Sequence, residues 1–212
     1  MARVDCVCGD WIFGDKIFMI SAEQIKELRE KTGAGISDVK RALEESGGDM
    51  TKALAAIERK LGSAAGKRAG RQTHAGVVNA YIHSNARVGV LIELFCETDF
   101  VARSPAFVGL AHDFALHIAA MNPVYVSRQD VPRDLWETEK ERCREEARAT
   151  GKPAVIQEQI VEGKLQAHFG ALSLLDQPFV KEQEKSVGAI LNEAIGRFGE
   201  NIRVGRFVRF EL

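Results

Sequence analysis

The fold of this chain is decided by the stretch Val88-Gly-Val-Leu-Ile-Glu-Leu-Phe-Cys-Glu-Thr-Asp-Phe-Val-Ala-Arg103. Its apolar part, Val88–Phe95, has the composition of a strand and runs directly into Thr98 and Asp99. An Asp at such a junction can cap the helix that follows. Phe100, at the start of that helix, leaves two interpretations open. Either Phe100 belongs to the core and Asp99 is only a helix cap, or Phe100 is presented on a rigid strand-to-helix corner and enters another molecule.

The spacing of apolar residues on both sides of this stretch predicts the other strands and helices. Segments rich in β-forming residues predict three strands, at Val77–His83, Arg87–Phe95 and Ile202–Phe210. Helical periodicity predicts four helices, at Phe107–Met121, Leu135–Ala149, Val155–Phe169 and Val187–Ile195. The second and third of these helices should form a helical hairpin at about 133–169, because only a short break separates them. Since strands and helices do not alternate strictly, we predict an α+β fold, in which residues 74–212 form a core domain with a three-stranded antiparallel sheet and packed helices.

Residues 19–61 have the pattern of a small three-helix module. Ser21 and Gln24 form a capping box at the start of its first helix. Glycine-containing breaks then separate the helices, and glycines at such breaks can take positive φ. About forty residues bury only a small core, so this module should be marginally stable by itself. Residues 62–73 carry glycines and basic residues without an apolar stripe, and we expect a basic linker or a frayed helix there.

The composition is that of an ordinary globular protein. The 212 residues are 45% apolar and 28% charged, with a formal net charge of -1. This charge argues against a dedicated nucleic-acid-binding protein. No apolar run reaches the roughly 18 to 20 residues of a membrane span. Four scattered cysteines do not form a disulfide framework, so we expect a cytoplasmic protein.

Residues 1–18 differ from the rest of the chain. They resemble neither a transit peptide, because they contain three Asp residues, nor a signal peptide, because they lack a long apolar core. We expect Met19 to be the biological start and residues 1–18 to be an over-extended or non-native segment. The alternative is a functional extension with a metal site at Cys6 and Cys8, although two thiolates without a second pair make a poor zinc site.

No pattern of side chains predicts catalysis, a bound cofactor or a metal site. The five histidines show no ligand spacing on a helix face. Cys96 has no sequence feature that would supply a general base or an oxyanion pocket. We therefore expect Cys96 to be a small buried apolar residue.

Two segments together resemble a known family. Leu28–Leu43, which reads Leu-Arg-Glu-Lys-Thr-Gly-Ala-Gly-Ile-Ser-Asp-Val-Lys-Arg-Ala-Leu, and Glu93–Arg103 are similar in order and separation to the signature motifs of elongation factor Ts. Other similar stretches are Gly151–Pro153, Val161–Lys164, Gln177–Val180 and Arg206–Leu212. The resemblance runs from about Ile20 to the end of the chain, and implies that the N-terminal module is of the ubiquitin-associated type.

The resemblance implies a function without catalytic chemistry of its own. Such a protein is a guanine nucleotide exchange factor that binds elongation factor Tu, both GDP-bound and nucleotide-free. It promotes GDP release by displacing the support of Mg²⁺, and GTP can then load. Carried over from the family motif, the residues that dislodge Mg²⁺ would be Thr98, Asp99, Phe100 and Val101. The N-terminal module would bind the partner through Leu28, Arg29, Thr32, Gly33, Gly35, Ile36 and Lys40.

The chain departs from the family pattern at three points. Ile36-Ser37 stands where two methionines are common, and Ser104 stands where Asn is frequent. The chain also has one strand-pair core, whereas longer members have two related halves and a longer coiled-coil insertion. It resembles the short form found in some bacteria. A homodimer in a two-plus-two complex would supply the missing half, with a sheet edge as the interface.

Two other functions remain open from the sequence. A ubiquitin-associated-like adaptor would explain residues 22–61 but would give Thr98–Arg103 no role. An RNA-binding translation accessory would use the basic residues of 62–73 and of the last strand, but the near-neutral charge and the few aromatics argue against it. We therefore expect neither direct nucleic-acid binding nor membrane binding.

Overall fold

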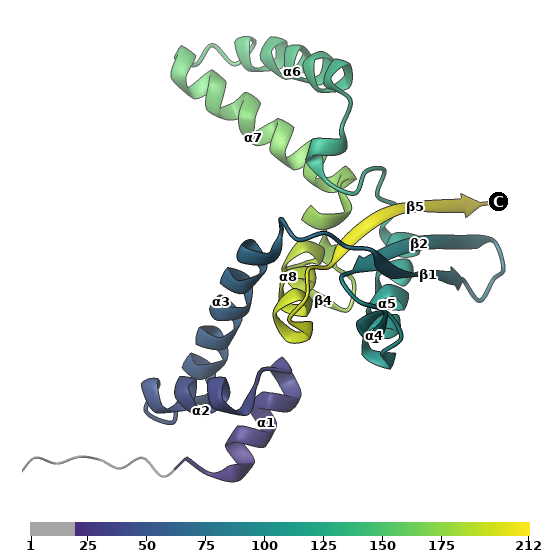
Figure 1. The fold of residues 1–212 in the computed structure, drawn as a ribbon. Coiled ribbons are helices and arrows are strands. Elements are labelled where there is room, and N and C mark those ends of the chain that lie inside the picture. Colours follow the sequence, from purple (N-terminus) through teal and green to yellow (C-terminus); the bar gives the residue numbers. More distant parts are fainter. Residues whose placement is uncertain (1–19) are drawn as a thin grey trace, which may run out of the picture. The chain divides into compact units, whose positions relative to one another are not determined.

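The computed structural model describes residues 20–212, which form helices, one three-stranded sheet and one two-stranded sheet (Figure 1). The chain divides into two compact units, one that ends at Ile57 and one that spans Glu58–Leu212. The expectations for Met19, for residues 1–18 and for a site at Cys6 and Cys8 lie outside the described residues.

The first unit contains α1 (Ala22–Thr32), α2 (Ile36–Glu45) and the start of α3 (Met50–Arg68). The predicted capping box is confirmed, because the Gln24 N–H donates to Ser21 Oγ at 3.1 Å and the Ser21 N–H donates to Gln24 Oε1 at 3.0 Å. All three helices contribute buried apolar side chains, which include Leu28, Val39, Leu43, Ala53 and Ile57. The three helices predicted from the apolar stripes are therefore present.

Helix α3 continues to Arg68, into the segment expected to be a linker or a frayed helix. Packing within the second unit explains this longer helix. Leu61 lies so close to α8 (Val187–Phe198) that a Cβ on Gly196 would be 2.5 Å from Leu61 Cδ2. One turn earlier, Glu58 accepts a hydrogen bond from Lys185 Nζ at 2.9 Å. Contacts with distant residues thus support a helix that its own glycines disfavour.

The second unit is built on the predicted antiparallel sheet, which has the order β1 (Ala75–Ile82), β2 (Val88–Cys96), β5 (Arg203–Glu211). The side chains of β2 alternate between the two faces, as the pleat requires. One face packs against α5 (Pro105–Met121), which contacts β1 and β2 (Figure 1). The core includes Val90, Ile92 and Leu94 from β2 and Phe107, Phe114 and Ile118 from α5. The predicted α+β fold is confirmed for this unit.

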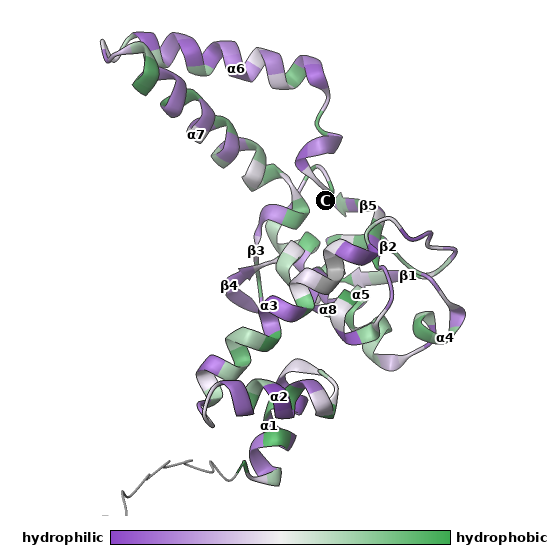
Figure 2. Ribbon diagram, turned by 60° about the vertical axis from the view of Figure 1, so that its left-hand side comes forward, coloured by the Kyte–Doolittle hydropathy of each residue, from purple (hydrophilic) through white to green (hydrophobic). Residues whose placement is uncertain are grey.

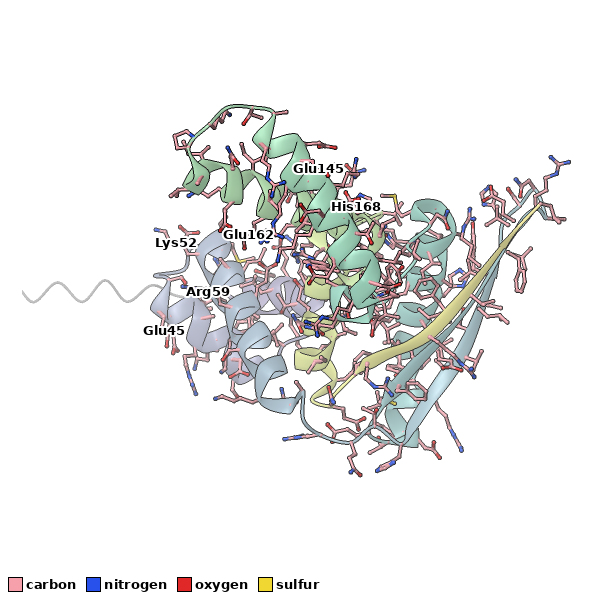
Figure 3. The ribbon with its side chains drawn as sticks, turned by 90° about the horizontal axis from the view of Figure 1, so that it is seen from above. Glu45, Lys52, Arg59, Glu145, Glu162 and His168 are labelled. Atoms are coloured by element: carbon pink, nitrogen blue, oxygen red, sulfur yellow. The ribbon has the colours of Figure 1, made fainter. Side chains whose placement is uncertain are left out.

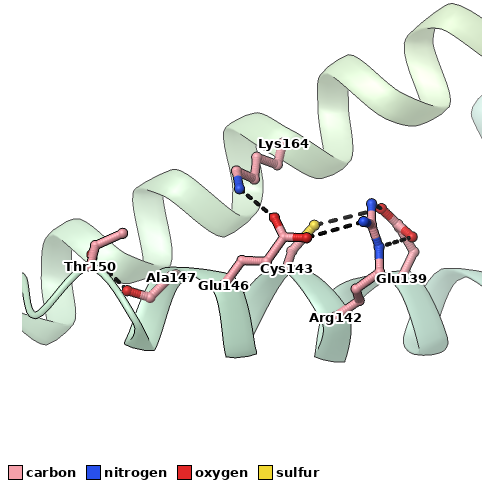
Figure 4. A network of polar contacts seen from close by, with 7 residues as sticks. All are labelled: Glu139, Arg142, Cys143, Glu146, Ala147, Thr150 and Lys164. Carbon is pink, nitrogen blue, oxygen red and sulfur yellow. Dashed lines mark hydrogen bonds and ion pairs between the residues drawn. The ribbon is translucent and has the colours of Figure 1, made fainter.

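A helical hairpin is also present, formed by α6 (Arg133–Arg148) and α7 (Ala154–Leu172). It has a small apolar cluster of its own, and the Trp136 ring stacks on Phe169 with centroids 4.5 Å apart. The surface of α6 is largely hydrophilic, as Figure 2 shows in purple. Between the helices, Lys164 pairs with Glu146, which also accepts from Arg142 at 3.1 Å (Figure 4).

Short elements between the hairpin and α8 were not predicted. They are the 3₁₀ helix Leu174–Asp176 and a two-stranded sheet of β3 (Pro178–Phe179) and β4 (Glu182–Ser186). A further 3₁₀ helix, Arg128–Asp130, precedes α6. Within residues 20–212, no helix combines the length and apolar character that crossing a bilayer requires.

A buried histidine on α5 connects this region to the core. The Val180 N–H donates to His117 Nδ1 at 3.2 Å, so Nδ1 must be unprotonated. On the other side of the ring, Nε2 donates to Gln177 Oε1 at 2.9 Å. Burial lowers the pKa of the His117 imidazole below its ordinary value of 6.5, against the opposing effect of the Gln177 hydrogen bond. The structure therefore requires the neutral ring.

We expect His117 to make the second unit less stable in mild acid. Because its pKa is lower in the folded state, the unfolded chain binds more protons just below pH 6.5, and the free energy of unfolding falls as the pH drops. One group contributes at most about 1.4 kcal/mol per pH unit. The free energy of unfolding, measured by urea unfolding between pH 8 and 5, should depend less steeply on pH for His117→Asn than for the natural chain.

The matched control is His168→Asn, because His168 is exposed on α7 (Figure 3). If the free energy of unfolding depends on pH as steeply in His117→Asn as in His168→Asn, His117 is not the source of the acid sensitivity.

Candidate functional site

The predicted corner is a tight connection from β2 to α4 (Asp99–Ala102). Thr98 lies between them in extended conformation, and its side-chain oxygen accepts from the Val101 N–H at 3.4 Å. The helix cap is therefore Thr98, and the interpretation of Asp99 as the cap is wrong. The reason is geometric, because Asp99 is the first residue inside the helix and a capping side chain must precede it.

Phe100 is one of the most exposed apolar side chains in the described chain, with 87% of its surface accessible. The next two residues, Val101 and Ala102, are buried in the core. The interpretation of Phe100 as a core residue is therefore wrong. An α-helix has 3.6 residues per turn, so α4 points Phe100 away from the core when it points Val101 and Ala102 into it.

Asp99 lies beside Phe100 and is also exposed. Its carboxylate is 3.7 Å from Arg103 NH2, which is one helical turn away. Such an exposed pair contributes little stability. The corner thus presents a carboxylate and an aromatic ring at the surface, while Val101 fixes the backbone beneath them.

A residue far away in the sequence supports this corner. Glu200 lies between α8 and β5, and its Oε2 accepts from the N–H groups of Glu97 and Thr98 at 3.1 and 3.0 Å. Its Oε1 accepts from the Thr98 hydroxyl at 2.6 Å. Sequence reasoning missed Glu200, because a single Glu after a glycine at a helix end carries no signal for a contact about a hundred residues away.

The residues predicted for the N-terminal module divide into two groups. Leu28 and Thr32 are buried, and Thr32 Oγ1 donates to the Leu28 carbonyl at 2.6 Å and accepts from the Ala34 N–H at 3.2 Å. These two residues therefore shape the α1–α2 turn and are not part of its surface.

The exposed members of the set lie in or beside that turn. They are Arg29, Gly33, Gly35, Ile36 and Lys40. Gly33 ends α1 with a φ of 66°, which favours glycine, whereas Gly35 has an ordinary φ of -62°. Ile36 is 55% exposed, an apolar side chain at the start of α2. This surface belongs to the first unit, and the corner belongs to the second unit.

Both cysteines of the second unit, Cys96 and Cys143, are buried. Cys96 is fully buried at the end of β2, and burial raises the pKa of its thiol, with a further contribution from the Glu200 charge. The prediction that Cys96 acts as a small buried apolar residue is confirmed. Among residues 20–212, no three His, Cys, Asp or Glu side chains are grouped as a metal site would require.

Comparison with known proteins gives one consistent result. Residues 14–212 match the family model described as elongation factor TS. The elongation factor Ts of Carboxydothermus hydrogenoformans is 51% identical over 194 residues, which cover 92% of this chain and 89% of that protein. The elongation factor Ts proteins of Pseudothermotoga lettingae and Thermotoga petrophila are 48% and 50% identical over 193 residues. In both cases the match covers 91% of this chain, and it covers 98% and 96% of the relatives.

Proposed function

The chain belongs to the elongation factor Ts family, and we propose on this premise that it is a guanine nucleotide exchange factor for elongation factor Tu. The observation that carries the proposal is the exposed ring of Phe100, next to the Asp99 carboxylate, on a corner whose backbone is fixed from below. Aromatic side chains are enriched in protein interfaces, where a few residues carry most of the binding energy.

The proposed mechanism requires no reaction in this chain. Binding of the factor and binding of GDP to elongation factor Tu oppose each other, and by linkage each weakens the other to the same degree. GDP is held largely through its phosphates and Mg²⁺. Asp99 and Phe100 would enter the partner and displace the elements that support the metal. Thr98 and Val101 would hold these two side chains in place, because the first caps α4 and the second anchors it in the core.

The N-terminal module would provide a second contact with the partner. Arg29, Ile36 and Lys40 offer two charges and an apolar side chain around the α1–α2 turn. We also propose that this three-helix module is of the ubiquitin-associated type and that the protein acts in the cytoplasm, where translation takes place.

Release of a fluorescent GDP analogue from elongation factor Tu tests the function. A small amount of the chain should accelerate release severalfold or more, and added Mg²⁺ should oppose the effect because it stabilises the GDP-bound form. If GDP leaves at its spontaneous rate even with excess chain, the proposal fails. A ubiquitin-associated-like adaptor or an RNA-binding accessory would give this negative result.

We further propose that the chain forms a homodimer through the outer face of the sheet, and not through the sheet edge expected from the sequence. On that face, residues paired across the three strands form rows. One row contains Ala80, Leu91 and Val208, and the next contains Ile82, Gly89 and Phe210. The large apolar side chains in these rows are 46–69% exposed. A contiguous apolar surface of this kind is typical of a protein interface.

Phe210→Glu should weaken this dimer at least about 30-fold, since truncating a central aromatic contact typically removes about 2 kcal/mol of binding energy. Sedimentation at micromolar concentration should show a dimer for the natural chain and a monomer for the variant. Val155→Glu is the matched control, because Val155 is 72% exposed on the helical hairpin and lies off the sheet. A natural chain that sediments as a monomer would contradict the proposal.

A further inference from the structure

The Glu200 side chain makes an unusual set of contacts for a half-buried residue in a turn. Both of its carboxylate oxygens are used on the β2–α4 corner, one for the N–H groups of Glu97 and Thr98 and the other for the Thr98 hydroxyl. Hydrogen bonds to a charged acceptor are roughly twice as strong as neutral ones. Glu200 therefore holds the residues just before Asp99 at three atoms.

The contact with the Thr98 hydroxyl also sets the cap of α4. A hydroxyl has one proton, and donating it to Glu200 turns the oxygen lone pairs toward the Val101 N–H, 3.4 Å away. A helix of a single turn is unstable by itself and depends on such a cap and on its buried residues. Glu200 thus acts on the orientation of α4 through Thr98.

The turn that carries Glu200 is itself held firmly. Gly199 ends α8 in the left-handed region with a φ of 74°. The next residue but one, Asn201, is buried, and its N–H donates to Glu97 Oε1 at 2.6 Å while its Nδ2 donates to the Arg71 carbonyl at 2.7 Å. Glu200 therefore accepts backbone N–H groups from the β2–α4 corner, and Glu97 of the corner accepts the backbone N–H of Asn201. The corner is thus hydrogen-bonded to a turn that is itself held in place.

We propose that Glu200 is a positioning residue for nucleotide exchange, which holds the β2–α4 corner in the conformation that presents Asp99 and Phe100 to the partner. This inference rests on the proposed function and adds a residue to it. Without Glu200, the corner would sample other conformations, and only a fraction of molecules would be ready to bind. The apparent affinity for the partner then falls by that fraction.

The test compares Glu200→Ala with Glu193→Ala in the full chain. Glu193 is a half-buried carboxylate on α8 that bonds Lys185 Nζ at 2.8 Å and does not contact the corner. GDP release from elongation factor Tu is measured over a range of chain concentrations. For Glu200→Ala we expect the half-maximal concentration to rise about tenfold, with a maximal rate within about twofold of the natural chain. Glu193→Ala should leave both values near those of the natural chain.

A double-mutant cycle against the combined variant Asp99→Ala/Phe100→Ala separates positioning from a merely structural role. If Glu200 acts through Asp99 and Phe100, removing Glu200 in that background should raise the half-maximal concentration less than about twofold further. Glu200→Gln keeps an oxygen that can accept the two N–H groups, so it should rescue part of the loss. This variant also keeps the test valid if Glu200→Ala does not fold.

The outcomes distinguish this inference from the proposed function. If the natural chain fails to release GDP, both are overturned. If the natural chain is active and Glu200→Ala matches it, or if the losses in the double-mutant cycle simply add, the positioning role alone is overturned.

Discussion

Phe100→Ala should slow the release of GDP from elongation factor Tu at least about 30-fold at subsaturating concentrations of the factor, while its melting temperature stays unchanged. The kinetic loss corresponds to about 2 kcal/mol or more, as expected for truncating an aromatic residue at the centre of an interface. The stability should not change, because the ring is 87% exposed in the free protein and has little buried surface to lose. Stopped-flow release with a fluorescent GDP and thermal unfolding on the same sample measure the two quantities.

Asp99→Ala gives a second measurement at the same corner. Since Thr98 is the cap, removing Asp99 should remove only the favourable placement of a carboxylate at the helix start, which amounts to about 0.3–1 kcal/mol. Exchange should fall as it does for Phe100→Ala. If Phe100→Ala melts much lower and yet exchanges nucleotide normally while folded, the proposed role of the corner is wrong.

Phe107→Ala should have the opposite pattern, a free energy of unfolding lowered by about 3–5 kcal/mol. Phe107 lies at the start of α5, is fully buried, and meets the Phe198 ring edge-on with centroids 5.8 Å apart. Alanine would leave a cavity at the point where α5, α8 and the sheet meet. Urea unfolding measures the change.

The two phenylalanines are a matched pair, because they are the same residue type and lie seven positions apart. Phe107→Leu preserves most of the volume and should lower the free energy of unfolding by less than about 1.5 kcal/mol, which controls for the loss of aromatic character. A Phe107→Ala protein as stable as Phe107→Leu would mean that α5 is packed differently from the structure described above.

The strongly periodic parts of the chain could be predicted from the sequence. The three strands, the helical hairpin and helices α5 and α8 begin or end within a few residues of their predicted positions, because each buries one regular face. Strand β4, Glu-Gln-Glu-Lys-Ser at 182–186, was missed because its charged residues have no strand pattern. It pairs with β3, and its Lys185 forms ion pairs with Glu58 on α3 and Glu193 on α8.

At the corner, the sequence alone left open which residue caps the helix and which side chain is buried. The pattern Thr-Asp-Phe-Val allows either Thr98 or Asp99 to be the cap, and either Phe100 or Val101 to be buried. The register of this four-residue helix against the sheet decides between them, and the residue that caps the helix is hydrogen-bonded by Glu200, about a hundred positions later. Likewise, the length of α3 depends on Leu61 and Gly196, which no local pattern connects.

The self-contained core of the α6–α7 hairpin has a consequence for how members of this family can differ in length. The hairpin reverses at Gly151, a left-handed residue with open space around it, and the neighbouring residues are exposed. Its buried contacts come from its own two helices and the segment leading into α6. Whole helical turns can therefore be added or removed at this tip during evolution without altering the sheet or the corner, and the same tip is a suitable place to attach a reporter.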